Sequence, residues 1–259
     1  MDDKNPYSAP DSEVVDSNPG GFQLHDPRRV PASNGWAWIS EGFAHFTQSP
    51  GVWILICIVG FVIAMLLSIN STVSMLAQAT ASIWAGGLML GCRAQDEGKS
   101  ISVGHLFACF AYKAGPLLLV TIITSVLSFL IFAAVTNGDI IQIYAASLNG
   151  EDPVKAFQEM GDIRSFLIKI LVALLFIMPV IAMSWFAPAL IVLNNVSLGQ
   201  ALTMSLKGCF INFWPMAIYG LVLLVFFILG ALPLGLGLLI VMPMFYGSLY
   251  RSYKDIYIN

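Results

Sequence analysis

The segment GVWILICIVGFVIAMLLS, residues 51–68, decides the fold class of this chain. It contains no charged side chain and none of the alternation of polar and apolar residues that is typical of a barrel strand. A helix needs about 20 apolar residues to cross the hydrocarbon core of a bilayer, where its backbone amides must be satisfied within the helix itself. The segment therefore predicts a membrane-spanning α-helix.

The composition of the whole chain supports the same fold class. Of its 259 residues, 58% are hydrophobic and 10% are charged, whereas soluble domains contain about half apolar and a quarter charged residues. The net charge of -3 is small and gives no indication of a nucleic-acid partner. We therefore predict an all-α integral membrane bundle whose main surroundings are the lipid bilayer.

Hydropathy predicts six spans within a single membrane domain, residues 34–259. The predicted spans are Gly51–Ser68, Thr72–Cys92, Gly115–Val135, Ser165–Leu193, Pro215–Ala231 and Leu234–Tyr250. The second span is the least apolar, but its small residues at Ala77, Ala81, Ala85, Gly87 and Gly91 have spacings typical of packed membrane helices. A Gly- and Pro-rich turn joins the last two spans and predicts a tight hairpin, with a re-entrant pair as the alternative.

The regions outside the spans set the orientation. Residues 1–33 are rich in Pro, Gly and acidic side chains, which predicts a disordered tail. Lys and Arg are retained in cytoplasmic loops, and placing both termini in the cytoplasm puts nine of these cations inside and three outside. Inside are Lys4, Arg28, Arg29, Arg93, Lys99, Lys113, Lys207, Arg251 and Lys254, and outside are Lys155, Arg164 and Lys169. In the outer loop, Asp152 and Pro153 predict the start of a short helix that ends near Met160.

Three segments with helical apolar spacing precede the first, third and fifth spans. Each ends near a proline that opens the next span: Pro50, Pro116 and Pro215. The apolar positions are Trp36, Ile39, Phe43 and Phe46; Val103, Leu106, Phe107 and Phe110; and Leu198, Leu202, Leu206, Phe210 and Phe213. These segments predict cytoplasmic amphipathic helices in the membrane interface, which either fix the depth of the spans or bind lipid or a protein partner. The pattern also suggests a threefold repeat of one interfacial helix and two spans.

No signature of an enzyme, cofactor or metal site was found. The chain lacks HExxH, GxSxG and P-loop motifs, and its spans carry no carboxylate or histidine near their middle. Cys92, Cys109 and Cys209 could bind a zinc ion together with His45 or His105. These residues, however, lack the close ligand spacing that is usual for zinc sites. We therefore predict neither catalysis nor a bound cofactor.

The fourth predicted span contains the only candidate ligand site. Two prolines interrupt it, and such breaks free backbone carbonyls that a ligand could use, although kinks that improve packing are the alternative. Two asparagines at its end could contact the same ligand or could end the helix. The candidate residues are Pro179, Ser184, Trp185, Pro188, Asn194 and Asn195.

Four segments together resemble a known family. They are VPASNGWAWISEGFAHF (30–46), GCRAQDEGKSISVGHLFACF (91–110), WFAPALIV (185–192) and LPLGLGLLIVMPMFYGSLYRSYKDIY (232–257). In their order they are similar to a proteobacterial family of uncharacterised multispanning inner-membrane proteins, and the resemblance runs from about Val30 to the last residue. It implies a bacterial inner membrane, and it implies no activity and no functional residues.

Three functions therefore remain open. The first is a non-enzymatic scaffold or accessory protein that holds a protein partner or lipid at its interfacial helices. The second is a transporter or channel for a small or lipid-like solute, and the third is an intramembrane enzyme. The scaffold predicts that the region from Pro179 to Pro188 is packed solid, whereas the transporter predicts a polar cavity there that water can reach.

Overall fold

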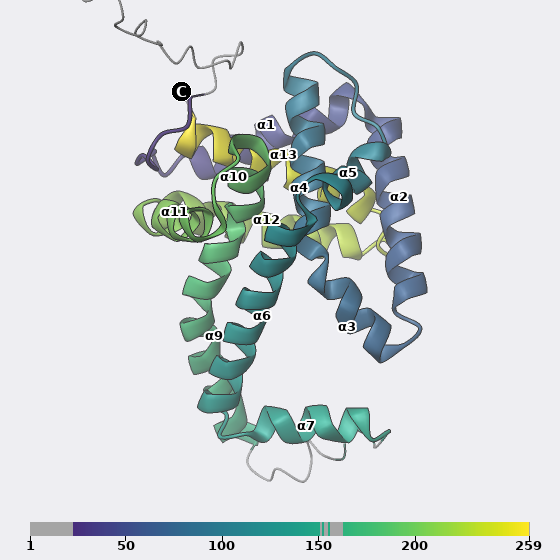
Figure 1. Ribbon diagram of the computed structural model, residues 1–259, viewed down its shortest axis with the longest axis vertical. Coiled ribbons are helices and arrows are strands. Elements are labelled where there is room, and N and C mark those ends of the chain that lie inside the picture. The colour runs from purple at the N-terminus through teal and green to yellow at the C-terminus, as the bar shows by residue number, and fades with distance from the viewer. Residues whose placement is uncertain (1–22, 151, 153–154, 156–162, 259) are drawn as a thin grey trace, which may run out of the picture.

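The computed structural model describes residues 23–258 apart from 151, 153–154 and 156–162, and within this part the named elements are all helices (Figure 1). The all-α fold class is thereby confirmed. In chain order the helices are α1 (Asn34–Gln48), α2 (Pro50–Leu67), α3 (Ser71–Ala79), α4 (Ala81–Asp96), α5 (Gly104–Tyr112), α6 (Ala114–Val135), α7 (Asp139–Leu148), α9 (Ile163–Trp185), α10 (Ala187–Asn194), α11 (Leu198–Ile211), α12 (Phe213–Ala231) and α13 (Leu238–Tyr257).

Among the described residues, four stretches are long and apolar enough to cross a membrane, and a fifth arises if α3 and α4 count as one span. The four are α2, α6, α12 and the stretch Arg164–Asn194, which joins α9 to α10. Helices α3 and α4 meet at an angle of 43°. The sixth predicted span differs, because α13 starts four residues later than expected and any 18-residue window of it contains Arg251, Lys254 and Asp255.

The surfaces of the candidate spans are apolar and largely exposed. At most 22% of the residues in any of the four spans are buried by the rest of the chain. Phe61 on α2 and Leu171 on α9 are typical, since about two thirds of each side chain is uncovered. Such a surface fits an integral membrane protein, in which lipid tails cover the side chains.

Helices α6 and α9 lie side by side and lead away from the rest of the bundle to α7, which lies across their far end (Figure 1). Lys169 on α9 forms an ion pair of 2.8 Å with Asp139 at the start of α7. Sequence reasoning did not predict α7. The short helix predicted from Pro153 to Met160 falls mainly on residues outside those that the structure describes.

The three short helices predicted ahead of spans are present as α1, α5 and α11. Each is followed by a long apolar helix after one residue with a similar non-helical backbone: Ser49 (φ −151°, ψ 61°), Lys113 (φ −139°, ψ 25°) and Asn212 (φ −110°, ψ 34°). In each case the amide of this residue still donates to a carbonyl of the preceding helix, at Phe46, Cys109 and Gly208. The location of these helices in the membrane interface and the threefold repeat stay predictions.

Helices α1 and α13 cross in direct backbone contact. A Cβ atom placed on Gly42 would lie 2.3 Å from the amide nitrogen of Ser248, and one on Gly247 would lie 2.5 Å from the carbonyl oxygen of Gly42. Only glycine at both positions allows this approach.

The chain ahead of α1 also packs on α13. Leu24 and Ile258 form an antiparallel bridge, and the amides of His25 and Arg28 donate to the carbonyls of Tyr257 and Ile256. The sequence predicts a disordered tail over residues 1–33, and the part of it from residue 23 onward makes these backbone bonds to α13. Composition could not reveal pairing with residues more than 200 positions away. Residues 1–22 lie outside the described part.

Helices α12 and α13 pack as a close pair around two glycines. A Cβ on Gly237 would lie 2.6 Å from the Cα of Gly230, and the turn between the helices uses positive φ at Leu234 (54°) and Gly235 (81°). A hairpin of two spans and a re-entrant pair both contain such a turn, so the choice between them stays a prediction.

Candidate functional site

Three helices end close together at one end of the bundle, and their last residues are polar. Helix α4 packs against both α10 and α13 there. The guanidinium of Arg93 on α4 donates to the carbonyl of Leu193 on α10 (3.2 Å), and the hydroxyl of Tyr253 on α13 donates to the side chain of Asn194. Helix ends carry unpaired backbone carbonyls, so a cation such as Arg93 is favourable at this place.

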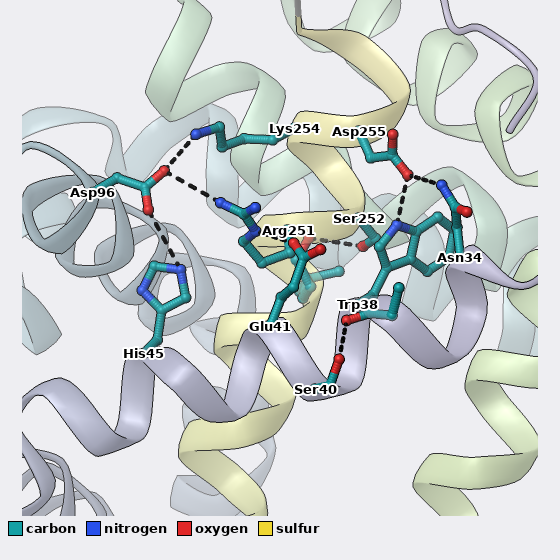
Figure 2. Close-up of polar contacts among 12 residues, drawn as sticks. Asn34, Trp38, Ser40, Glu41, His45, Asp96, Arg251, Ser252, Lys254 and Asp255 are labelled. Atoms are coloured by element: carbon teal, nitrogen blue, oxygen red, sulfur yellow. Dashed lines mark hydrogen bonds and ion pairs between the residues drawn. The ribbon is translucent and has the colours of Figure 1, made fainter.

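The centre of this region is a group that we call the Asp96 cluster, formed by Glu41, His45, Asp96, Arg251 and Lys254. One carboxylate oxygen of Asp96 accepts from Lys254 and lies 3.9 Å from Arg251, and the other lies 3.6 Å from the Nε2 atom of His45. Arg251 also donates to Glu41 on α1 at 2.6 Å. Figure 2 shows that the side chains come from α1, α4 and α13, so the cluster ties three helices together.

His45 is the most deeply buried member of the cluster, with 2% of its surface exposed. Burial lowers the pKa of its imidazole, the negative charge of Asp96 opposes this effect, and Arg251 adds to it. The lowered pKa favours the neutral imidazole, so the charged groups that face one another in the cluster are two cations and two carboxylates. Its Nδ1 atom has no hydrogen-bond partner within the described part of the chain.

The backbone of His45 is also held in place. Its carbonyl oxygen accepts from the indole of Trp53 (3.1 Å) and from the side-chain amide of Gln95 (3.0 Å). Its ring meets the ring of Tyr250 edge-on, with centroids 5.6 Å apart. These contacts fix the end of α1 against α4 and α13, so the cluster is rigid on the side of α1.

A second carboxylate, Asp255, clamps the start of α1 to α13. One of its oxygens accepts from Asn34 (2.7 Å) and from the indole of Trp38 (2.8 Å) (Figure 2). Arg28 lies 3.4 Å from the other oxygen and also donates to the Asp255 carbonyl at 2.7 Å. Asp255 thereby connects α13 to α1 and to the segment that precedes it.

The space among these groups is small. A cavity of about 20 Å³ lies between Arg93, Asn194, Tyr250, Tyr253 and Lys254. A water molecule needs roughly 10–15 Å³ measured in this way, so the cavity holds about one water. The charges here can bind water and hold helices together, whereas an organic substrate does not fit into this cavity.

Of the two prolines in the predicted fourth span, only Pro188 adjoins a break, and the structure packs this break tightly. Pro179 lies inside α9, and Pro188 lies in the first turn of α10. At the break, the hydroxyl of Ser205 on α11 accepts from the amide of Phe186 (2.9 Å) and donates to the carbonyl of Ala182 (2.6 Å). A side chain inserted into the helical hydrogen-bond ladder is a common cause of such breaks.

The other predicted site residues separate into two groups. Ser184 donates to the carbonyl of Ile181 (2.9 Å), and Trp185 packs edge-on against Tyr219 and Phe245 at 6.3 and 6.1 Å. The buried indole nitrogen of Trp185 has no hydrogen-bond partner among the described residues.

Asn194 and Asn195 lie at the polar end of the bundle, where α10 ends, and not at the break between α9 and α10. Asn194 accepts from Tyr253, and Asn195 ends α10 with a left-handed backbone (φ 55°) and accepts from Lys113. The helix-ending alternative therefore describes Asn195. That the six residues face a ligand stays a prediction.

The cysteines do not gather at a metal site in the part of the chain that the structure describes, where no group of three or more His, Cys, Asp or Glu side chains could hold an ion. Cys92, Cys109 and Cys209 are buried free thiols.

Sequence reasoning missed the Asp96 cluster as a site. It identified Arg251 and Lys254 only as cytoplasmic cations that set the orientation. One feature of the sequence did point to the cluster: residues of opposite charge follow the apolar parts of α4 and α13. Both of these helix ends belong to the side of the protein that is predicted to carry most of the Lys and Arg residues. His45 gave no such signal, because a lone histidine is common on a helix.

Similarity to known proteins gives no identification. No family model, curated protein or solved structure matches this chain. The resemblance to a proteobacterial membrane family therefore stays a prediction.

Proposed function

We propose that the protein is a non-enzymatic multi-pass scaffold or accessory protein of a bacterial inner membrane, with both termini and helices α1, α5 and α11 on the cytoplasmic side. The observation that carries the proposal is the packing of the break between α9 and α10. Phe186, Ala187 and Leu190 are fully buried there, and Ser205 satisfies the backbone groups that the break frees. A packed break favours the scaffold over a transporter, which needs a polar path at this position.

The polar end supports the same function. The Asp96 cluster and the Asp255 clamp connect α1, α4 and α13 through ion pairs whose removal costs stability. Alternating access requires such helices to separate and rejoin. A scaffold instead gains from a fixed arrangement, because a partner then binds without ordering the surface first.

The exposed faces of α1 and α11 supply the surface for a partner. On α1, Ser40, Ala44 and Thr47 are exposed, and on α11 Thr203 and Lys207 are exposed. Helical spacing puts Phe43 on the same face of α1 and Phe210 on the same face of α11, so each exposed face carries both polar and aromatic side chains. Such a mixed face suits the membrane interface, where its polar groups can still meet a partner. The partner surface that we propose is therefore the exposed face of α1 and α11.

The test is purification of the tagged full chain from native membranes in nanodiscs, followed by mass spectrometry of everything that remains bound. The informative variant carries Ala44→Glu and Thr203→Glu, which place charge on the proposed surface. At position 203 the new carboxylate also pairs with Lys207 one turn later, so the helix is preserved. The matched control is Asn149→Glu, an exposed position after α7 at the other end of the bundle.

If the chain is a scaffold, the wild-type chain and the Asn149→Glu control should each retain a bound partner protein in stoichiometric amount, and the double variant should lose it. If the wild-type chain carries no protein, or if the double variant and the control retain the same set, the scaffold proposal is wrong.

One observation favours a transporter as the second candidate. The indole nitrogen of Trp185 is buried without a hydrogen-bond partner among the described residues, and such groups are rare unless a water or ligand satisfies them. Trp185→Phe removes this donor and keeps a smaller aromatic ring at the position. Solute flux into vesicles that depends on the protein and falls in this variant would support the transporter.

A further inference from the structure

A second cavity lies at the junction of α11 and α12. It is larger than the cavity at the polar end, and its lining is mostly apolar. Its volume is about 370 Å³, within the range of small-molecule sites. The wall is formed by Phe210, Ile211, Phe213, Trp214 and Pro215 on one side and by Arg29, Val30 and Ala32 on the other. We call this space the Arg29 cavity.

Arg29 supplies the only charged side chain of the cavity lining. It is exposed, and within the described part of the chain it has no ion pair or hydrogen bond, whereas its neighbour Arg28 is bound to Asp255 and Lys207 to Asp26. A guanidinium offers five donors in a fixed fork that matches a phosphate group. The charge of the cavity is therefore complementary to an anion.

The backbone of Arg29 is held on both sides even though its side chain is free. The amide of Val30 donates to the side chain of Asn212 (2.9 Å), and the amide nitrogen of that side chain donates back to the carbonyl of Arg28 (2.9 Å). The amide of Arg28 in turn donates to Ile256 on α13 (3.0 Å). Asn212 is fully buried, so the cation stands on a rigid base beside the cavity.

The aromatic wall places the cavity at the depth of lipid headgroups. Helix α12 is a candidate span whose first residues are Phe213 and Trp214, and Trp214 is 70% exposed. Exposed tryptophan at the start of a span is typical of the boundary between headgroups and tails. A lipid phosphate at this depth reaches Arg29, while the acyl chains of the same lipid lie along the exposed apolar face of α12.

We propose that the Arg29 cavity binds the phosphate headgroup of an anionic phospholipid. The inference depends on α12 spanning the membrane and does not depend on the scaffold function. The main competitor for Arg29 is the acidic segment ahead of residue 23, which contains Asp11, Glu13 and Asp16.

The experiment titrates the full chain in mild detergent with phosphatidylglycerol or phosphatidylcholine and reads bound lipid by native mass spectrometry. Wild type is expected to prefer phosphatidylglycerol, because the choline of phosphatidylcholine already neutralises its phosphate and leaves less for Arg29 to gain. Arg29→Gln is expected to weaken phosphatidylglycerol binding about tenfold, the effect of losing one charge-assisted hydrogen bond, and so to reduce the preference. Arg29→Lys keeps the charge without the fork and should lie between them. Lys99→Gln removes one positive charge from an exposed residue paired with Glu97 and should match wild type.

Two results would overturn the proposal. If Arg29→Gln keeps the wild-type preference, the cation is not used for lipid, as expected when the acidic segment occupies it. If Lys99→Gln loses as much preference as Arg29→Gln, the effect is one of total charge and not of a site. Because Arg29 is exposed, all three variants should unfold at the wild-type temperature.

Discussion

Replacing Gly42 by alanine tests whether the close crossing of α1 and α13 orders the polar end. The new Cβ would lie 2.3 Å from the Ser248 nitrogen and 2.7 Å from the Met244 carbonyl oxygen, whereas ordinary contact begins near 3.4 Å. The helices must separate by about 3.4 − 2.3 = 1.1 Å, because the obstructing atoms belong to the backbone and cannot rotate away.

Overpacking of this kind costs about 1–3 kcal/mol, and we expect the upper end because the strain has no side chain to relax into. Separation also lengthens the 2.6 Å contact of Glu41 with Arg251 and the 2.8 Å contact of Trp38 with Asp255. The higher helix propensity of alanine offsets roughly 1 kcal/mol. The expected net loss is about 2 kcal/mol, or about 4–8 °C in the unfolding temperature of a chain of this size.

The assay is thermal unfolding in mild detergent, followed with a thiol-reactive dye that reports exposure of Cys92, Cys109 and Cys209. The matched control is Gly199→Ala on α11, where a new Cβ meets nothing within 4 Å. The control should unfold at the wild-type temperature or slightly above it. Equal unfolding temperatures for Gly42→Ala and Gly199→Ala would refute the reasoning that this crossing sets the position of α1.

Three further predictions concern single groups. Asp96→Asn leaves Lys254 and Arg251 without their shared carboxylate. Because both cations are less than a third exposed, we expect thermal unfolding to show a loss of about 2 kcal/mol in the free energy of unfolding. Adding Lys254→Met to Asp96→Asn should recover part of this loss. Because burial lowers the pKa of His45, this residue takes up a proton at a higher pH in the unfolded chain than in the folded chain. The stability should therefore fall as the pH drops below about 6.5, and the unfolding temperature of His45→Asn should not show this fall. Burial raises the pKa of the Cys209 thiol to about 12, so maleimide at pH 7.5 should label Cys209 only after unfolding, and labelling of the native chain would contradict its burial.

The positions of the apolar helices could be predicted from the sequence almost to the residue. Hydropathy predicted residues 51–68, and α2 runs over Pro50–Leu67; it predicted 115–135, and α6 runs over Ala114–Val135. These boundaries are set by local chemistry, because the apolar run ends where the chain leaves the hydrocarbon. Pro50 likewise marks the end of α1, because α2 begins at this proline, whereas α12 begins at Phe213, two residues ahead of Pro215.

Features that depend on contacts between distant helices could not be predicted in this way. The second span breaks at Thr80, whose hydroxyl donates to Ala77 (2.6 Å) and accepts from the indole of Trp84 (2.7 Å), with no proline or glycine to mark the place. The charges at the end of α13 looked like a cytoplasmic tail after a span. They are helical and paired, because α1 and α4 bring Glu41 and Asp96 to them, and their cytoplasmic location stays a prediction.

The distribution of these contacts indicates where the arrangement of the helices is decided. Within lipid, apolar side chains gain little from leaving one apolar environment for another, so exposed spans such as α6 and α9 do not by themselves select their neighbours. Three sets of specific contacts lie at the polar end, where the Asp96 cluster, the Asp255 clamp and the Gly42 crossing each join α1 to α13. Conservative changes at these positions should therefore disturb the fold more than equally large changes on the lipid-facing sides of α6 or α9. A polar end held this firmly also keeps the surface of α1 and α11 in one shape, which is the property that a partner or a lipid headgroup would recognise.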